Sequence, residues 1–351
     1  MRMRYLILAL MLTPQLSAQT PCDTIDPVRY QENGKWGYLS ANGVVIAPKF
    51  DVATAFTPDG AIACAGDVCG RISSSGEFLP PTWNRNSVPF PEKYSEGLSP
   101  AVKDGEWGYI DFQRRLVVPF QFLYAGQFIN GRALVRLGDK SFFIDKAGKR
   151  ITPEFDGAFE FHEGLAAVLV GNNVGYIRPD GSFSIPAIHG SASGIDFSEG
   201  LAAVRVGGKV GFMDKSGNIV IEPRYDDVYP FSDGLAAVEL QGKWGYLDHQ
   251  GKLVVPIQFH MAHMFSEQLA SVHTGKKWGY INRSGDFVIA PEFDGAMPFC
   301  GGVAAVETHR VVGKTALREE LYQGRHGVIS HEGKYVWRDS QDVTWGSGYN
   351  P

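Results

Sequence analysis

The side chains in this sequence whose types and spacing could suit a metal ion are three histidines. His260 and His263 are close together, and His273 follows further along the same segment. Neutral imidazole nitrogens bind zinc and related ions, so a metal centre is one interpretation. On short strands and turns, however, such histidines more often have packing and surface roles. We therefore expect no metal site and no cofactor.

No familiar arrangement of catalytic residues accompanies them. The sequence has no His-Glu-x-x-His zinc motif, no Gly-x-Ser-x-Gly nucleophile turn, no Walker phosphate loop and no calcium-hand loop. The segment Gly190–Gly194 has the glycines of a nucleophile turn, but Ala192 occupies the place of the nucleophile. A loop between repeats explains this segment better. The sequence therefore predicts a protein that is not an enzyme, with no catalytic residue.

The feature that recurs through the chain is the dipeptide Trp-Gly. Nine copies can be aligned, although several replace the Trp and one also replaces the Gly. The positions equivalent to this Gly are Gly37, Gly70, Gly108, Phe142, Gly175, Gly211, Gly245, Gly279 and Gly327. A pattern that returns roughly every 34 residues identifies a tandem repeat protein.

Four copies keep the complete motif, and we assign them to the structural core. They are Trp36-Gly37, Trp107-Gly108, Trp244-Gly245 and Trp278-Gly279. Residues that recur in register usually maintain the fold, whereas a catalytic group tends to be unique. Alternate side chains of a strand point to opposite faces, so the Gly faces away from the Trp and lets a neighbouring backbone approach. Stacking of exposed Trp rings on carbohydrate is the functional alternative.

The elements that carry these motifs are predicted to be short strands. The chain has 42 Gly and 20 Pro, placed inside every repeat, which leave no room for helices of usable length. This excludes paired helices of the tetratricopeptide kind, whose repeat has a similar length. Asp248 and Asn282 are each followed three residues later by Gly, as in a tight hairpin turn. Each repeat is therefore a strand-turn-strand unit.

These units predict an all-β fold of about nine short β-hairpin repeats. One hairpin is marginally stable in water, but stacked copies can bury their aromatic faces on one another. We expect an elongated, solenoid-like array. A closed β-propeller is the alternative, although about 34 residues is brief beside the roughly 40 to 45 of a WD-type blade.

The repeat resembles that of the WG-repeat family, bacterial proteins with tandem copies of a segment around Gly-Lys-Trp-Gly-Tyr-Ile-Asp. The segment Gly242–Asp248 is the clearest copy here, and the resemblance extends from about Arg29 to about Trp337. It implies a β-repeat fold. The family has no catalytic residues to carry over to this sequence.

The N-terminus has the pattern of a secretory signal peptide. Arg2 and Arg4 precede an apolar run from Tyr5 to Leu12, which is too short to span a bilayer, and small residues precede Gln19. We expect cleavage after Ala18 and a periplasmic or secreted protein. No other stretch suits a membrane helix. The chain then divides into a signal peptide (1–18), an N-terminal segment (19–28), a repeat array (29–337) and a C-terminal tail (338–351).

The charge of the chain argues against some partners. The net charge is −5, and removal of the two N-terminal arginines gives 31 basic and 38 acidic side chains, or −7. There is also no Lys/Arg cluster. A mildly acidic surface of this kind does not favour nucleic acid or an anionic membrane.

Four cysteines remain after the predicted cleavage, which suggests two disulfides in an oxidising compartment. Cys64 and Cys69 lie on the two arms of the second hairpin, and Cys69 takes the place of the missing Trp. We expect them to pair, with two free thiols as the alternative. Cys22 and Cys300 would then form the second bond.

Two insertions interrupt the repeat, and irregular loops on a rigid frame are common binding positions. One is Pro80–Pro91, and the other is Thr308–Tyr322, which contains a possible short helix or is a terminal cap. The sequence therefore predicts an exported binding or scaffold module for a protein or a cell-envelope glycan. The alternative is a hydrolase of an envelope polymer, with its site in an insertion.

Overall fold

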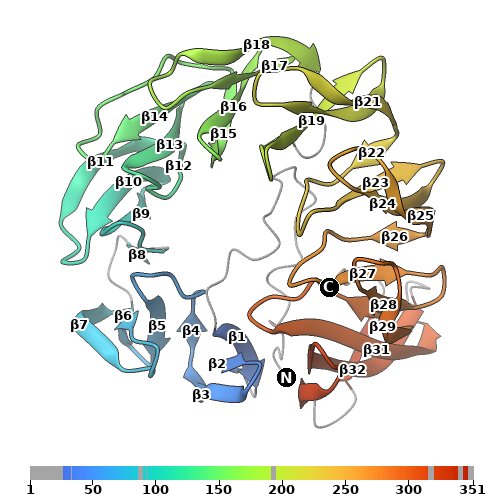
Figure 1. The fold of residues 1–351 in the computed structure, drawn as a ribbon. Coiled ribbons are helices and arrows are strands. Elements are labelled where there is room, and N and C mark those ends of the chain that lie inside the picture. The colour runs from blue at the N-terminus through green and yellow to red at the C-terminus, as the bar shows by residue number, and fades with distance from the viewer. Residues whose placement is uncertain are drawn as a thin grey trace.

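The computed structural model describes residues 27–32, 34–85, 90–91, 93–190, 195–314, 320–338 and 343–346. Strands, turns and loops make up these ranges, and none of the described residues is helical. The strands form small antiparallel sheets that follow one another around a ring, and the first and last sheets lie side by side (Figure 1). The all-β prediction is confirmed, and the ring is a nine-bladed β-propeller.

The first four blades occupy the first part of the ring. The first contains β1 (Val28–Glu32), β2 (Lys35–Ser40) and β3 (Gly43–Phe50). The second contains β4 (Val52–Ala53), β5 (Ala61–Ala65), β6 (Val68–Ile72) and β7 (Phe78–Asn84). The third contains β8 (Phe90–Pro91), β9 (Leu98–Lys103), β10 (Glu106–Asp111) and β11 (Leu116–Phe122). The fourth contains β12 (Tyr124–Ala125), β13 (Arg132–Leu137) and β14 (Lys140–Asp145).

The fifth and sixth blades are joined into one sheet, because Gly190 pairs with Arg205. The fifth contains β15 (Gly157–His162), β16 (Leu165–Val170), β17 (Asn173–Ile177) and β18 (Phe183–Gly190). The sixth contains β19 (Leu201–Val206), β20 (Lys209–Asp214) and β21 (Ile219–Tyr225).

Three further blades complete the ring. The seventh contains β22 (Asp227–Val228), β23 (Ala236–Leu240), β24 (Lys243–Leu247) and β25 (Leu253–Phe259). The eighth contains β26 (Met261–Ala262), β27 (Ala270–His273), β28 (Trp278–Ile281) and β29 (Phe287–Phe293). The ninth contains β30 (Gly295–Ala296), β31 (Val303–Lys314), β32 (Glu320–Ser330), β33 (Tyr335–Arg338) and β34 (Val343–Gly346). β34, which lies within the segment assigned to the tail, pairs with β32.

The expectation of an elongated solenoid is wrong, and the propeller alternative is confirmed. The repeat length of about 34 residues is the feature of the sequence that favours a solenoid. The first strand has only two residues in six blades. In five of them a single residue separates it from the last strand of the preceding blade; these five strands are β4, β12, β22, β26 and β30. Such short first strands let a four-stranded blade fit into about 34 residues, fewer than the WD-type blade needs.

The Gly of the Trp-Gly motif is required by the strand that follows it. A Cβ atom on Gly245 would lie 2.7 Å from the carbonyl oxygen of Val255 and 2.8 Å from the amide nitrogen of Ile257. These atoms come close because the register of β24 and β25 shifts between Trp244 and Tyr246, as in a β-bulge. Backbone atoms come equally close to Gly37, Gly211 and Gly279. The predicted approach of a neighbouring backbone is confirmed.

The Tyr that follows the Trp-Gly motif joins one blade to the next. Tyr246 is fully buried, and its hydroxyl donates a hydrogen bond to the carbonyl oxygen of His263 in the eighth blade. The same contact to the following blade is made by Tyr38, Tyr109, Tyr176 and Tyr280. Each blade therefore buries its aromatic face against its neighbour, so the core is a ring of inter-blade layers.

The ring closes through side chains from its two ends. Tyr30 and Leu39 of the first blade share a buried cluster with Val303 and Val328 of the ninth. The rings of Tyr30 and Trp337 have centroids 6.0 Å apart. In the described residues, strands of the first blade pair only with one another. Closure therefore depends on apolar packing between the two blades.

Candidate functional site

The four complete Trp-Gly motifs lie in four different blades. Trp36 and Trp278 are buried, whereas Trp107 and Trp244 are partly buried against the same kind of inter-blade core. Their glycines, Gly37, Gly108, Gly245 and Gly279, all face the backbone of the following strand. These residues are spread around the ring and form no common site.

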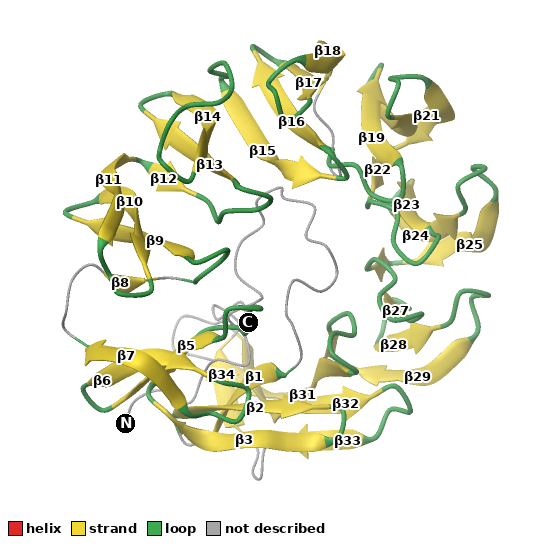
Figure 2. Ribbon diagram, turned by 60° about the vertical axis from the view of Figure 1, so that its left-hand side comes forward, coloured by secondary structure: helices red, strands yellow, loops and turns green. Residues whose placement is uncertain are grey.

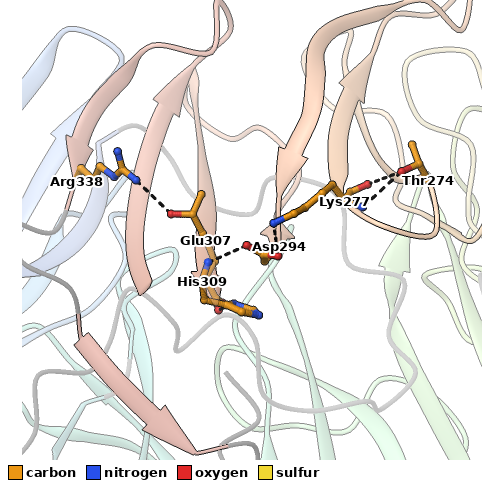
Figure 3. A network of polar contacts seen from close by, with 7 residues as sticks. Thr274, Lys277, Asp294, Glu307, His309 and Arg338 are labelled. Atoms are coloured by element: carbon orange, nitrogen blue, oxygen red, sulfur yellow. Dashed lines mark hydrogen bonds and ion pairs between the residues drawn. The ribbon is translucent and has the colours of Figure 1, made fainter. Parts of the chain in front are cut away.

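A recurring ion pair lies between neighbouring blades at four places in the ring. Lys277 of the eighth blade lies 2.5 Å from Oδ1 of Asp294, and Oδ2 of that carboxylate accepts a hydrogen bond from the amide of His309 in the ninth blade (Figure 3). The equivalent pairs are Lys35–Asp51, Lys140–Asp156 and Lys209–Asp226. Hydrogen bonds from Lys209 and from the amide of Gln241 hold the pKa of Asp226 below its ordinary value.

Serine and glutamate side chains make a second set of contacts between blades. The hydroxyl of Ser266 donates to the carbonyl oxygen of Phe299, and Glu267 accepts from the amide of Gly302. The serine contact recurs at Ser95 and Ser198, and the glutamate contact recurs at Glu96, Glu163 and Glu199. The recurring polar side chains thus make contacts between neighbouring blades.

The histidines with metal-like spacing have contacts of other kinds. His263 stacks on Trp278 with ring centroids 4.8 Å apart, and its Nδ1 lies 2.8 Å from Oγ of Ser271. Burial lowers the pKa of His263 to about 4. His260 contacts Nζ of Lys243, at the place where other blades have the aspartate of the ion pair. Within the described ranges, no three His, Cys, Asp or Glu side chains are placed to hold a metal ion.

Cys64 and Cys69 form a disulfide, as predicted, with sulfur atoms 2.01 Å apart. They face each other across β5 and β6, and both are buried with Trp83 and Tyr94. Cys300 is also disulfide-bonded. Cys22 lies outside the described residues, so the pairing of Cys22 with Cys300 stays a prediction.

The two insertions are mostly strands where the structure describes them. The first half of Pro80–Pro91 belongs to β7, and Trp83 lies opposite Cys69 in that sheet. In Thr308–Tyr322, both described portions lengthen the hairpin of β31 and β32. The possible helix there falls mainly on residues 315–319, outside the described ranges, as do four residues of the Gly190–Gly194 loop.

A polar cluster that departs from the repeat lies at the boundary of the fifth and sixth blades. It consists of Glu160 and His162 on β15 and Asp196 just before β19. β15 has six residues, whereas the first strand of six other blades has two. A bulge interrupts its pairing with β16 between Ala158 and Phe161. β15, which carries Glu160 and His162, is the inner strand of its blade (Figure 2).

Asp196 is the most enclosed member of this cluster. Its side chain is 7 % exposed, and its Oδ2 lies 3.8 Å from Nε2 of His162, too far for a hydrogen bond. Its Oδ1 has no hydrogen-bond partner in the described part of the chain. Burial raises the pKa of Asp196 to about 6, although the nearby His162 opposes the rise. This carboxyl group is buried with few compensating contacts.

Glu160 lies near this carboxyl and also reaches the fourth blade. Burial raises the pKa of Glu160 to about 7, and the negative charge of Asp196 adds to the rise. A Cβ atom on Gly126 would lie 2.5 Å from Oε1 of Glu160, so the absent side chain leaves the space that Glu160 fills. Two carboxyl groups from adjacent blades are therefore near enough for the charge of Asp196 to act on Glu160 at a partly buried place.

These three residues belong to no known motif and to no insertion, although the aligned repeats contain a signal for them. Glu160 and Asp196 both immediately precede the repeated aromatic residue of the Phe-Ser-Glu-Gly segment. The other aligned copies have no acid there; their residues are Ala55, Lys93, Gln127, Pro230, Met264 and Pro298. His162 occupies the position of the serine that elsewhere bonds to the next blade.

Comparison with known families agrees with the repeat pattern. The family model described as the WG containing repeat matches residues 107–140, 142–173, 175–209, 211–244, 244–278 and 278–309. The chain belongs to the WG-containing repeat family. The resemblance noted in the sequence is confirmed, and the matched WG repeats run from the third blade into the ninth. A search of curated proteins gave no match.

Solved structures resemble this WG-repeat protein in fold. One, titled the crystal structure of the eukaryotic initiation factor, has 10 % sequence identity and a TM-score of 0.59, with 90 % of this chain and 96 % of that chain covered. BamB from Moraxella catarrhalis has 10 % identity and a TM-score of 0.44, with coverage of 86 % and 95 %. At such identities a likeness concerns the fold alone. No membrane-spanning helix occurs among the described residues.

Proposed function

We propose that this WG-repeat propeller is an exported, non-enzymatic binding or scaffold module whose partner is a protein or a cell-envelope glycan. The observation that carries the proposal is the use of its repeated polar side chains. The Lys–Asp, Ser–carbonyl and Glu–amide contacts join neighbouring blades instead of converging on one place. A frame held in this way presents its non-repeated residues at fixed positions, which suits binding.

The disulfide between Cys64 and Cys69 supports export, because such bonds persist mainly in oxidising compartments. Residues 1–18, the predicted signal peptide, lie outside the described residues. Cell fractionation and the intact mass of the recovered protein test this part of the proposal. We expect a periplasmic or secreted protein that lacks residues 1–18, and a cytoplasmic protein that retains them would contradict it.

Co-sedimentation tests the binding role. The purified mature protein is incubated with isolated peptidoglycan and with outer-membrane fractions, and soluble fragments are assayed in the same tubes. We expect the protein in the pellet without released fragments. A protein denatured by heat and reduction serves as the control for non-specific trapping.

Two outcomes would contradict this expectation in different ways. Released fragments would indicate the alternative, a hydrolase of an envelope polymer with its site in an insertion. Protein that stays in the supernatant without cleavage would exclude both envelope roles, and cross-linking in intact cells would then seek a protein partner.

A further inference from the structure

Three departures from the repeat meet at one place between the fourth, fifth and sixth blades. Glu160 and Asp196 put an acid at the same repeat position in two adjacent blades. His162 replaces the serine that joins blades elsewhere. Gly126 stands where other copies have a side chain, namely Thr54, Phe159, Ile195, Tyr229, His263 and Met297. Maintenance of the repeat explains none of these changes, because the other blades form without them.

Together the changes create a place with buried negative charge and too few partners. The rest of the fold supplies a lysine to its recurring aspartates, as Lys209 does for Asp226. Among the described residues, His162 is the basic side chain that faces Asp196, and its Nε2 is 3.8 Å away. A buried carboxylate with an unpartnered oxygen lowers the stability of a fold. Retention of such a group is expected where a ligand provides the missing donors.

We propose that Glu160, His162 and Asp196 form a binding site for the side chain of a lysine or arginine in a basic segment of a partner protein. An ammonium or guanidinium group supplies positive charge and several N–H donors, and a guanidinium can bridge two carboxylates. The proposal rests on the proposed binding function and names the chemistry of the partner.

The exposure of the three residues favours a long side chain. Asp196 is enclosed, whereas Glu160 is partly exposed and the side chain of His162 is 30 % exposed. A ligand therefore enters past Glu160 and His162 and reaches Asp196 last. Lys and Arg carry their charge at the end of a thin, flexible stem, which suits this path. An amino group attached directly to a sugar ring has no such stem.

Direct binding measurements on the purified mature protein test the site. The probes are the tripeptides Gly-Arg-Gly and Gly-Lys-Gly with blocked termini, and Gly-citrulline-Gly is the neutral control of nearly the same shape. Glucosamine represents an amino sugar. We expect saturable binding of the two basic peptides by calorimetry and at least tenfold weaker binding of the citrulline peptide and of glucosamine.

Variants then locate the binding. The double variant Glu160→Gln, Asp196→Asn should weaken the basic peptides at least tenfold. The matched control is Glu106→Gln, Glu222→Gln, which removes the same charge at exposed positions and should leave affinity within twofold. Gly126→Ala keeps all charges but puts a methyl group against Glu160, so it should weaken binding as well. Near-ultraviolet circular dichroism checks that each variant is folded.

The remaining outcomes overturn the site. They are equal binding of the citrulline peptide, tighter binding of glucosamine, equal losses in both double variants, or no saturable binding at all. In each case wild-type protein that still co-sediments with its envelope fraction leaves the proposed function in place. Binding of the basic peptides without any co-sedimentation would support the proposed site and contradict the envelope role.

Discussion

The hydroxyl of Tyr246 lies 2.8 Å from the carbonyl oxygen of His263, and the two residues belong to different blades. This bond fixes where the eighth blade begins relative to the seventh, since His263 directly follows the short strand β26. The equivalent tyrosines repeat the bond around much of the ring. The Tyr of the motif therefore sets the relative position of successive blades.

Replacement of this tyrosine should destabilise the ring. Tyr246→Phe keeps the buried ring but leaves the carbonyl of His263 without its donor, so we expect a loss of about 1–3 kcal/mol in the free energy of unfolding. Urea unfolding followed by tryptophan fluorescence measures it. Tyr335→Phe is the control, because Tyr335 is 39 % exposed, and its loss should be smaller than ~0.5 kcal/mol. Equal losses would show that the inter-blade bond contributes little.

The Gly of the motif should tolerate substitution less well than a glycine in open space. Gly245→Ala places a methyl group 2.7 Å from a backbone oxygen, so we expect the free energy of unfolding to fall by about 1–3 kcal/mol or more. Gly190→Ala is the control, because its new Cβ would meet nothing closer than 3.9 Å. Thermal unfolding of the two variants compares them. A Gly245→Ala protein as stable as wild type would contradict the proposed role of the bulge.

Loss of the disulfide in the second blade should have a moderate effect. The bond between Cys64 and Cys69 closes a short loop, so replacement of both by Ala should lower the free energy of unfolding by about 2 kcal/mol. Denaturant unfolding under non-reducing conditions measures the difference. Peptide mapping without reductant provides the check on the bond itself, and alkylation of either cysteine in the native protein would refute it.

The carboxyl group of Glu160 should make stability depend on pH in a particular direction. Its pKa rises from 4.5 to about 7 on folding, so the folded state binds this proton more tightly than the unfolded state does. The resulting stabilisation is complete below pH 4.5 and is lost as the pH rises through about 7. The stability of wild type relative to Glu160→Gln should therefore fall across this interval, by an amount on the order of 1–3 kcal/mol.

A parallel measurement on Asp196 distinguishes this effect from general charge repulsion. The pKa of Asp196 rises from 3.8 to about 6 on folding. The stability of wild type relative to Asp196→Asn should therefore fall as the pH rises from about 3.8 to about 6, an interval below that of Glu160. Urea unfolding at a series of pH values gives both curves. Identical intervals for the two variants, or curves of opposite sign, would contradict the burial of these groups.

Much of the blade was predictable because its signals are local. The placement of Gly and Pro excluded helices, and Asp248 and Asn282 predicted the hairpin turns that follow them. Gly245 predicted the close approach of a neighbouring backbone. Closure of the ring could not be predicted, because it depends on the angle between successive blades. That angle results from contacts between blades, such as Tyr246 with His263, and the sequence pattern does not show these contacts. A two-residue strand such as β4 also leaves no periodic pattern to detect.

The candidate site could not be predicted from sequence motifs for a related reason. Glu160 and Asp196 lie in no known motif and in no insertion, because they are single substitutions inside well-formed repeats. They are 36 positions apart in the chain, and only the packing of adjacent blades brings them together. A column-by-column comparison of the nine copies would have found both acids, but not the burial that raises their pKa values.

The seam between the first and ninth blades has a consequence for circular permutation of the chain. Tyr30 and Val303 meet there by packing alone, and in the described residues no strand crosses from one blade to the other. Nothing in that arrangement requires the ring to begin where it does. A circular permutant that starts in the exposed turn at Asp104 and Gly105, between β9 and β10, with a short linker across the seam, should assemble the same nine blades from a different beginning.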